Sequence, residues 1–263
     1  MKFRAHQTAL YLVLALGFVQ SVGIASCVLP AKSGVTLADD EYNFIRVYKS
    51  GDVDKYRTKV KVEGTKGTIE INLVTTDTVK DVKSDGSYVI QTKIDSGTLT
   101  IGESTNPFAG VGQTISTTFD RTGKMQKTDS ASSGRGGGVA ELIGITRLNF
   151  TSTDGLKMGE TRKFELALGE SGSQKAVGSI KVVKLEKPGN EVKVESVKVQ
   201  TTAVVSGKTT PGEKPVRLDT TSLVDPKSAV VYKLTGSVSD LPLGTLGSGR
   251  VAFDRVRLES QSP

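Results

Sequence analysis

Few side chains in this sequence could perform nucleophilic or metal chemistry. The chain has one histidine, His6, one cysteine, Cys27, and no tryptophan. Ser-His-Asp and Cys-His catalysis and histidine-ligated zinc sites all need an imidazole or a free thiolate. A chain that is cut before Cys27 and modified on that sulfur retains neither group. These chemistries, and structural disulfides, are then excluded.

An enzyme would then have to use carboxylates, lysines, tyrosines or an all-oxygen metal site, and Asp77, Asp81 and Asp85 recur at four-residue spacing. A hydrolase that uses two carboxylates needs a close pair in a cleft, with one raised pKa. Two of these three lie near turn residues and all are expected to be solvated, so a carboxylate-based hydrolase is the least favoured hypothesis. A calcium loop at 81–86 would have Lys83 at a ligand position, which favours a simple turn. We therefore expect no metal and no cofactor.

The first 27 residues have the order of a secretory signal. Lys2 and Arg4 precede an apolar run, Ala9–Val19, and the segment Ile24-Ala25-Ser26-Cys27 resembles a bacterial lipobox. The run is shorter than the roughly 20 apolar residues that span a bilayer. This pattern predicts cleavage before Cys27 and lipidation of its sulfur.

Cleavage by an ordinary signal peptidase is the alternative. Gly23 and Ala25 would then be the small residues before the cut, and Cys27 would remain a free thiol. An unpaired thiol is unusual in an exported protein, because oxidising compartments favour paired cysteines. Lipidation is favoured, and it implies an exported envelope protein anchored in a membrane by its acyl chains. In lipoproteins with such a signal, Asp after the cysteine often gives retention at the inner membrane. Val28 favours the outer membrane or periplasmic face if the cell has two membranes.

The composition fits an exported globular protein and argues against a nucleic-acid partner. Removal of residues 1–26 from the 263-residue chain leaves 237, which is ample for a hydrophobic core. The removed segment contains Lys2 and Arg4 but no acidic residue, so the net charge falls from +7 to +5. Nucleic-acid readers show a dense basic stripe, whereas these charges are spread along the chain.

Period-two alternation dominates the mature chain. In Tyr56–Val62 one face carries Tyr, Thr and Val, and the other carries Arg and Lys, as in a strand buried on one side. The runs 69–73 and 88–94 alternate in the same way, and turn signals such as Asp85-Gly86 separate the runs. We therefore expect an all-β, antiparallel fold with two duplicated units, forming a curved sheet, a half-barrel or a pair of sandwiches. One short helix is expected near 139–147.

Two of the predicted strands change phase. In Glu191–Thr202 and in Arg250–Leu258, the apolar residues switch between even and odd positions. A slip of one residue turns the buried face over. We therefore expect a β-bulge or bend near Glu195-Ser196 and another near Asp254-Arg255.

Short motifs recur in the same order, which indicates an internal duplication. The matched pairs are Gly51–Tyr56 with Gly159–Phe164, Gly67–Ile71 with Gly178–Val182, and Phe119–Arg121 with Phe253–Arg255. These positions are expected to be structural: Tyr56 and Phe164 pack inward, the lysines before them point outward, and Asp120 and Asp254 accept hydrogen bonds from turn amides. The predicted organisation is residues 1–26 signal peptide, 27–41 lipidated tether, 42–129 first β repeat, 130–150 glycine-rich linker with a short helix, and 151–263 second β repeat.

A family resemblance rests on these motifs. A lipobox, a short tether, the Gly-acid-x-x-Lys-aromatic strand opening and Phe-Asp-x-Thr-Gly at 119–123 resemble uncharacterised all-β bacterial envelope lipoproteins of duplicated build. The resemblance covers most of the mature chain. Such families have no assigned activity, so the resemblance implies no catalytic residue. In fold alone, the expected curved sheet is similar to the lipoprotein-carrier half-barrels of the bacterial envelope.

These observations leave two main hypotheses for function. The first is a non-catalytic, membrane-anchored lipoprotein with a structural or interaction role and an unknown protein partner. The second is a carrier that binds a lipid or another hydrophobic ligand in a concave sheet. Its candidate ligand-facing residues are Ile69, Ile71, Tyr88, Ile90, Val139, Leu142 and Ile143. An apolar cavity of about 300–1,000 Å³ would favour the carrier, and a filled core would favour the first hypothesis.

Overall fold

Alternating side chains make long strands that are buried on one face only. In the computed structural model, the strand Val53–Gly64 exposes every second residue from Val53 and buries those between, such as Tyr56 and Val60. Aromatic and β-branched residues suit such a half-buried pleated surface. The sheet that these strands build therefore has an inner face that carries the core.

The structure describes residues 41–42, 44–121, 123, 125–130, 155–168, 174–206, 215–243 and 246–258. Within them the strands are β1 (Glu41–Tyr42), β2 (Val53–Gly64), β3 (Gly67–Val82), β4 (Tyr88–Ile101), β5 (Ser104–Pro107), β6 (Thr114–Phe119), β7 (Met125–Ser130), β8 (Leu156–Lys157), β9 (Thr161–Leu168), β10 (Gln174–Glu186), β11 (Ser196–Ser206), β12 (Val216–Val224), β13 (Val231–Pro242) and β14 (Ser248–Leu258). The helix predicted near 139–147 lies outside the described residues. So do the predicted signal peptide and nearly all of the tether and the linker, and the domain boundaries remain predictions.

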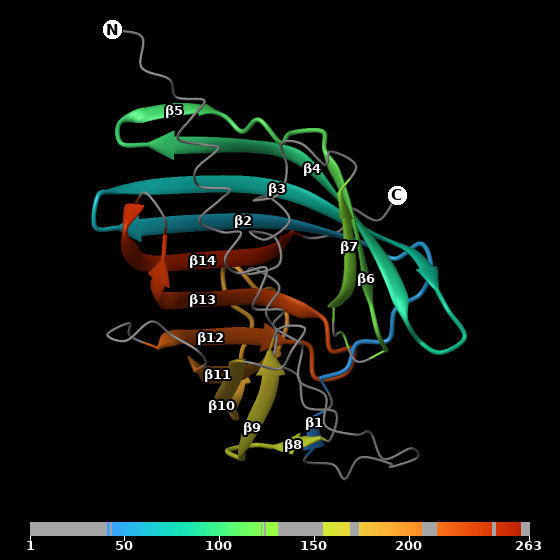
Figure 1. Ribbon diagram of the computed structural model, residues 1–263. Coiled ribbons are helices and arrows are strands. Elements are labelled where there is room, and N and C mark those ends of the chain that lie inside the picture. Colours follow the sequence, from blue (N-terminus) through green and yellow to red (C-terminus); the bar gives the residue numbers. More distant parts are fainter. Residues whose placement is uncertain are drawn as a thin grey trace, which may run out of the picture.

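Twelve strands pair into a single antiparallel sheet (Figure 1). Its order is β7-β6-β4-β3-β2-β14-β13-β12-β11-β10-β9, with β5 beside β4, while β1 and β8 form a separate two-stranded sheet. The pairing of β2 with β14 joins the first long strand to the last one. The predicted all-β, antiparallel fold is confirmed, in the form of one continuous open sheet.

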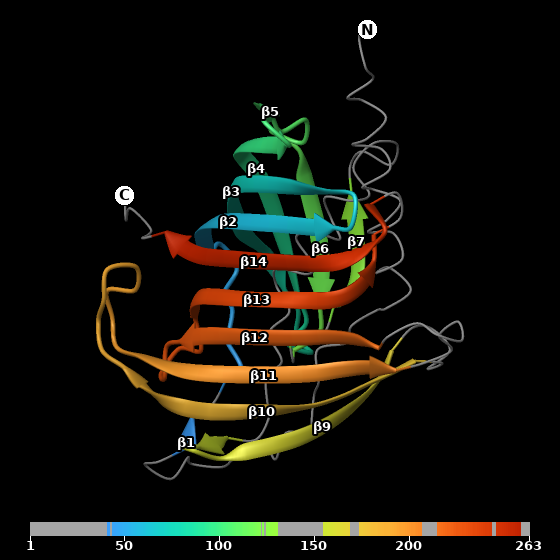
Figure 2. The same ribbon diagram turned by 90° about the vertical axis from the view of Figure 1, so that its left-hand side faces the viewer.

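The inner face of this sheet is filled by apolar side chains. Figure 2 shows the sheet curled, with β6 and β7 standing behind and across β13 and β14. The largest buried cluster includes Val60, Val62, Ile69, Ile71, Leu73, Ile94, Ile115, Phe164, Leu218, Leu234, Val251 and Phe253. A second cluster surrounds Phe44 and Leu156 near the small sheet. Curling lets a single sheet bury its own apolar face.

Glycines and register shifts allow the curvature. A β-bulge interrupts the β10–β11 register between Val182 and Lys184, and other shifts occur in β3, β12 and β13. Gly178 pairs with Phe164, and Gly236 pairs with Phe253. In both pairs the phenylalanine ring covers the glycine so closely that a Cβ atom would lie 2.6 Å from its Cζ. Bulges and such glycines are the features that bend a sheet.

The irregularity predicted near Glu195-Ser196 is a bend at Val194 rather than a β-bulge, and the one predicted near Asp254-Arg255 is wrong. Strand β11 begins at Ser196, so Val194 lies before the strand rather than on an altered face of it. Strand β14 pairs with β2 without a register shift from Gly249 to Leu258. After Phe253, the inward positions of β14 are taken by arginines instead of apolar residues, and this made the pattern look out of phase.

The matched motifs differ in how well their structures agree. Gly51 and Gly159 both have positive φ. The N–H of Gly51 donates to the carbonyl of Val79 in β3, and the N–H of Gly159 donates to the carbonyl of Val182 in β10. The acid after each glycine accepts a hydrogen bond from the N–H three residues before it, in both cases a lysine. Tyr56 and Phe164 are buried as predicted.

The other two matches occupy different places. Gly67 opens β3 opposite Gly64, whereas Gly178 lies inside β10. Asp120 precedes a turn, but Asp254 lies within β14, so its predicted role at a turn is wrong. The duplication itself remains a prediction.

We predict that Gly236→Ala destabilises the fold by about 1–3 kcal/mol, because overpacking a filled core forces side chains from their rotamers. An added Cβ at Gly236 would lie 2.6 Å from Cζ of Phe253 and 2.9 Å from the carbonyl oxygen of Asp219. Urea unfolding measures the effect. The matched control is Gly189→Ala, where an added Cβ meets nothing within 4 Å. Equal stabilities for the two variants would contradict the proposed role of this glycine.

Candidate functional site

The chain reaches its first long strand by crossing the inner face of the sheet. Residues 44–49, here called the crossing segment, connect β1 to β2, and Figure 2 shows them as a blue trace behind the strands. Phe44 is buried, whereas the side chain of Val47 is 82% exposed. Arg46 and Tyr48 line the pocket between the crossing segment and the sheet.

Asp54 holds the crossing segment to the sheet. This residue of β2 points to the inner face and is only 5% exposed. Its carboxylate forms an ion pair with Arg46 of the crossing segment. Its Oδ1 also accepts a hydrogen bond from Nε of Arg257 on β14 at 2.7 Å and forms an ion pair with Nη2 of the same guanidinium at 2.7 Å. One carboxylate therefore joins three separate segments.

A second ion pair lies beside the first. Nη2 of Arg255 on β14 donates to Oδ2 of Asp77 on β3 at 2.8 Å, and the hydroxyl of Thr92 on β4 donates to Oδ1 at 2.7 Å. The Arg255 guanidinium lies over the ring of Tyr56, 3.7 Å from its centroid. This pair ties four neighbouring strands together, and the aromatic face gives the cation a further favourable contact.

Asp54 is held in its ionised form. Burial alone would raise the pKa of Asp54, but the guanidinium groups of Arg46 and Arg257 outweigh it and hold the pKa of that carboxyl below its usual range. Burial also raises the pKa of the Tyr56 phenol, which stays protonated. The inner face therefore carries fixed charges at neutral pH.

The positive charges outnumber the negative ones. We define the arginine cluster as Arg46, Arg255, Arg257, Asp54 and Asp77. The three arginine side chains are 14%, 13% and 22% exposed and the two aspartates 7% and 9%. Three guanidinium groups meet two carboxylates, so the cluster has one positive charge in excess.

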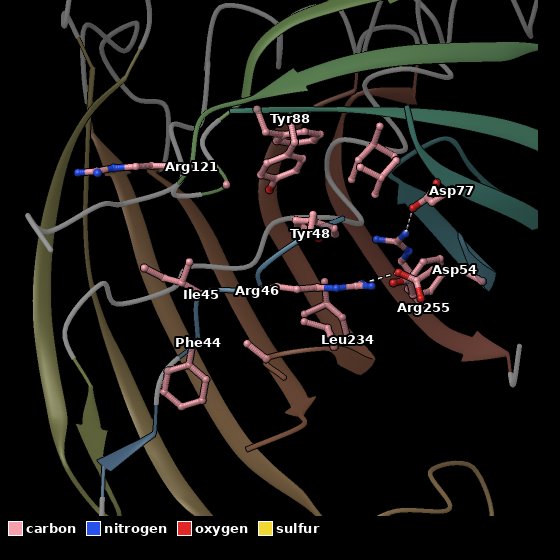
Figure 3. A pocket seen from close by; sticks show the side chains of 17 residues that line it. Phe44, Ile45, Arg46, Tyr48, Asp54, Asp77, Tyr88, Arg121, Leu234 and Arg255 are labelled. Atoms are coloured by element: carbon pink, nitrogen blue, oxygen red, sulfur yellow. Dashed lines mark hydrogen bonds and ion pairs between the residues drawn. The ribbon is translucent and has the colours of Figure 1, made fainter. Parts of the chain in front are cut away.

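A pocket of about 130 Å³ opens beside the arginine cluster. Figure 3 shows Tyr48 between Arg46 and Tyr88. The Tyr48 and Tyr88 ring centroids are 4.4 Å apart, and Phe119 stacks on Tyr88 at 5.3 Å. Apolar side chains from the crossing segment and strands β3, β4 and β13 complete the wall. The pocket thus has an aromatic wall and a charged end, where Arg46 and Arg255 line it together with Asp54 and Asp77, while Arg257 lies behind the lining residues.

The predicted ligand-facing residues divide into three groups. Tyr88 and Ile90 line the pocket. Ile69 and Ile71 are buried in the main core cluster and are not among the lining residues. Val139, Leu142 and Ile143 lie outside the described residues, as does Cys27.

The carboxylates of the hydrolase hypothesis are not brought together. Asp77 is buried and ion-paired, so the expectation that it is solvated is wrong. Asp81 and Asp85 are exposed, and Asp85 accepts a hydrogen bond from the Ser87 amide. A turn closes with the Gly86 amide donating to the Lys83 carbonyl, which agrees with the favoured interpretation of this loop.

Sequence reasoning missed the arginine cluster, although a signal was present. Asp54 is in phase with Tyr56 on the inward face of its strand, and Arg255 and Arg257 are in phase with Phe253. Charged residues at inward positions are costly unless they are paired. Opposite charges in the inward phase of two strands could therefore have indicated a buried network.

Two further observations concern only the described part of the chain. No group of three or more histidine, cysteine or acidic residues there could hold a metal ion. Nor does that part contain a helix with the length and apolar character needed to cross a bilayer.

Comparison with known proteins gives only distant likenesses. No protein family and no curated protein matches the sequence. DynF, from the dynemicin biosynthesis pathway of Micromonospora chersina, is 8% identical with a TM-score of 0.24, over 91% of this chain and 97% of its own. An outer membrane lipoprotein-sorting protein domain from Vibrio parahaemolyticus is 10% identical with a TM-score of 0.21, over 79% and 83%. Likenesses this weak carry no argument about function, and the resemblance to envelope lipoproteins remains a prediction.

We predict that Arg255→Gln lowers the free energy of unfolding by roughly 3–5 kcal/mol, because it removes the guanidinium that pairs with the buried Asp77 carboxylate. Denaturant unfolding measures the loss. The double variant Asp77→Asn with Arg255→Gln should recover part of it, since no unpaired charge remains. Arg250→Gln, which removes an exposed charge from the same strand, should stay within about 0.5 kcal/mol of the parent chain. If the double variant lost as much stability as Asp77→Asn and Arg255→Gln lose in sum, the two residues would not stabilise the fold as a pair.

The lowered pKa of Asp54 predicts that the free energy of unfolding falls in acid. Its pKa is lower in the folded chain than the value of about 3.9 in an unfolded chain. The unfolded state therefore binds more protons in this range, and the stabilisation is complete above pH 4 and is lost as the pH falls through the folded pKa. The stability difference between the parent chain and Asp54→Asn should shrink below about pH 4. A difference that stays constant from pH 7 to pH 3 would contradict this.

Proposed function

We propose that this protein is exported, is anchored in a membrane of the cell envelope by acyl chains on Cys27, and acts by interaction rather than by catalysis. The signal pattern before Cys27 supports both the export of the protein and its lipid attachment to a membrane. Two or more acyl chains give stable attachment, because each buried CH₂ contributes about 0.8 kcal/mol. The curved sheet would then stand at the membrane surface as a binding module.

The observation that carries the non-catalytic part is the pairing of both inward carboxylates with arginines. A general acid or base works best when its pKa lies near the working pH. The contacts of Asp54 move its pKa in the opposite direction. Asp77 is engaged by Arg255 and Thr92. These carboxylates are suited to holding the fold together and to setting the charge of the pocket.

The size of the pocket favours this role over the carriage of a whole lipid. Its volume of about 130 Å³ is well below the roughly 300–1,000 Å³ of typical sites for larger ligands. Two of the predicted ligand-facing residues, Ile69 and Ile71, belong to the filled core instead. The carrier remains the second candidate, because Tyr88 and Ile90 do line the pocket.

We predict that the full-length chain expressed in a bacterium incorporates an alkyne-tagged fatty acid and sediments with membranes. The Cys27→Ser variant should incorporate none and should be found in the soluble exported fraction, since it lacks the sulfur that would carry the lipid. Gel fluorescence and fractionation measure both properties. Ser26→Ala, a neighbouring change that keeps the cysteine, is the control. Labelling that persists in Cys27→Ser would contradict the anchor.

Native mass spectrometry of the soluble Cys27→Ser variant tests the second candidate. We expect the mass of the chain without any two-chain lipid, because the pocket is too small for one. A two-chain lipid that copurifies in a one-to-one ratio would make the carrier the better proposal.

A further inference from the structure

We infer that the pocket under the crossing segment binds a small organic monoanion, in which one carboxylate is attached to a flat apolar body about the size of a single ring. An interaction module does not require such a site, so this inference goes beyond the proposed function. It rests on the charge of the arginine cluster, the aromatic wall and the volume between them.

The first step is the uncompensated charge. Among the described residues, Asp54 is shared by Arg46 and Arg257, and Asp77 pairs with Arg255, so every arginine has a carboxylate partner but the cluster keeps one positive charge in excess. Each side chain in the cluster is less than one quarter exposed. A net positive charge is costly at such a position, and a bound anion would offset that cost.

Of the described carboxylates, only Asp54 and Asp77 form ion pairs with the arginines of the cluster. Asp225 accepts hydrogen bonds from the amides of Lys227 and Ser228 and from the hydroxyl of Tyr232. Among the described residues it makes no ion pair with the arginine cluster. Arg121 lines the rim of the pocket and adds another cation, although its guanidinium extends away from the cluster in Figure 3.

The second step is the supply of hydrogen-bond donors. A guanidinium group has five N–H donors in a planar fork that matches a carboxylate. Arg46 and Arg255 each use one nitrogen on an aspartate, and both line the pocket. Each therefore keeps further donors for a carboxylate placed at the charged end of the pocket.

The third step is the shape of the remaining space. Tyr48, Tyr88 and Phe119 form a continuous aromatic wall, with centroid separations of 4.4 Å and 5.3 Å. Flat rings pack favourably against such a surface. The pocket volume of about 130 Å³ is close to that of an engineered cavity of about 150 Å³ that binds benzene. One ring with a small anionic group fits this space.

Three probes separate the two requirements of the site. Benzoate has the ring and the charge, benzamide has the ring without the charge, and acetate has the charge without the ring. Each is titrated by calorimetry and by amide chemical shifts into the mature Cys27→Ser chain. We expect benzoate to bind at least tenfold more tightly than benzamide or acetate, with shifts at Tyr48 and Tyr88.

Two variants with the same change in charge locate the site. Arg46→Gln leaves Arg257 on Asp54 and Arg255 on Asp77, so it makes the cluster neutral while every buried carboxylate keeps an arginine. Benzoate should then bind no more tightly than benzamide. Lys55→Gln removes one charge from the exposed outer face of β2 and should leave benzoate binding unchanged.

The parent chain alone can overturn the inference. If benzamide bound as tightly as benzoate, the negative charge would have no role. If acetate bound as tightly as benzoate, the aromatic wall would have no role. Absence of benzoate binding at millimolar concentration would also overturn it, as would equal affinities in Arg46→Gln and Lys55→Gln. None of these results depends on fatty-acid labelling at Cys27, so failure here is distinguishable from failure of the proposed function.

Discussion

The buried ion pairs of Asp54 and Asp77 are the contacts on which the rest of the structure depends. They lie at the seam where β2 meets β14, between residues up to 203 positions apart in sequence. Without this seam the sheet would divide into two halves, each with an exposed edge. Asp54 also fixes the crossing segment, which lies across the inner face. The same charges therefore connect the two halves of the sheet and form one end of the pocket.

The inner face has two regions of different character. Along most of the sheet, inward apolar side chains pack against one another in the main core cluster. Toward the crossing segment, the inward positions of β2, β3 and β14 change from apolar to charged, and the packing opens into a pocket. Charges remain there because each aspartate is met by guanidinium groups, which offsets part of the cost of burial. The binding role that we propose for this region depends on that change along the strands.

Much of the fold was predictable because a strand buried on one face has a strict period. The alternation in Tyr56–Val62 predicted both the strand and its inward face, and the structure agrees. The same rule failed in Arg250–Leu258, where Arg255 and Arg257 occupy inward positions and Val256 lies on the other face. A rule that equates apolar with inward cannot recognise paired charges whose partners lie far away in the sequence. Of the candidate site, Tyr88 and Ile90 were predicted, whereas the arginines and Asp54 were not.

The sequence by itself determined the strand-rich class, the inward face of most strands and the turns between them, because these depend on neighbours a few residues apart. It also predicts the signal and the lipid attachment, which remain to be tested. Only the tertiary structure decided that the strands form one open sheet, that β2 lies against β14, and that three arginines share two aspartates beneath the crossing segment. Those features depend on contacts between distant segments, and the charge balance of a buried cluster exists only once the segments have met.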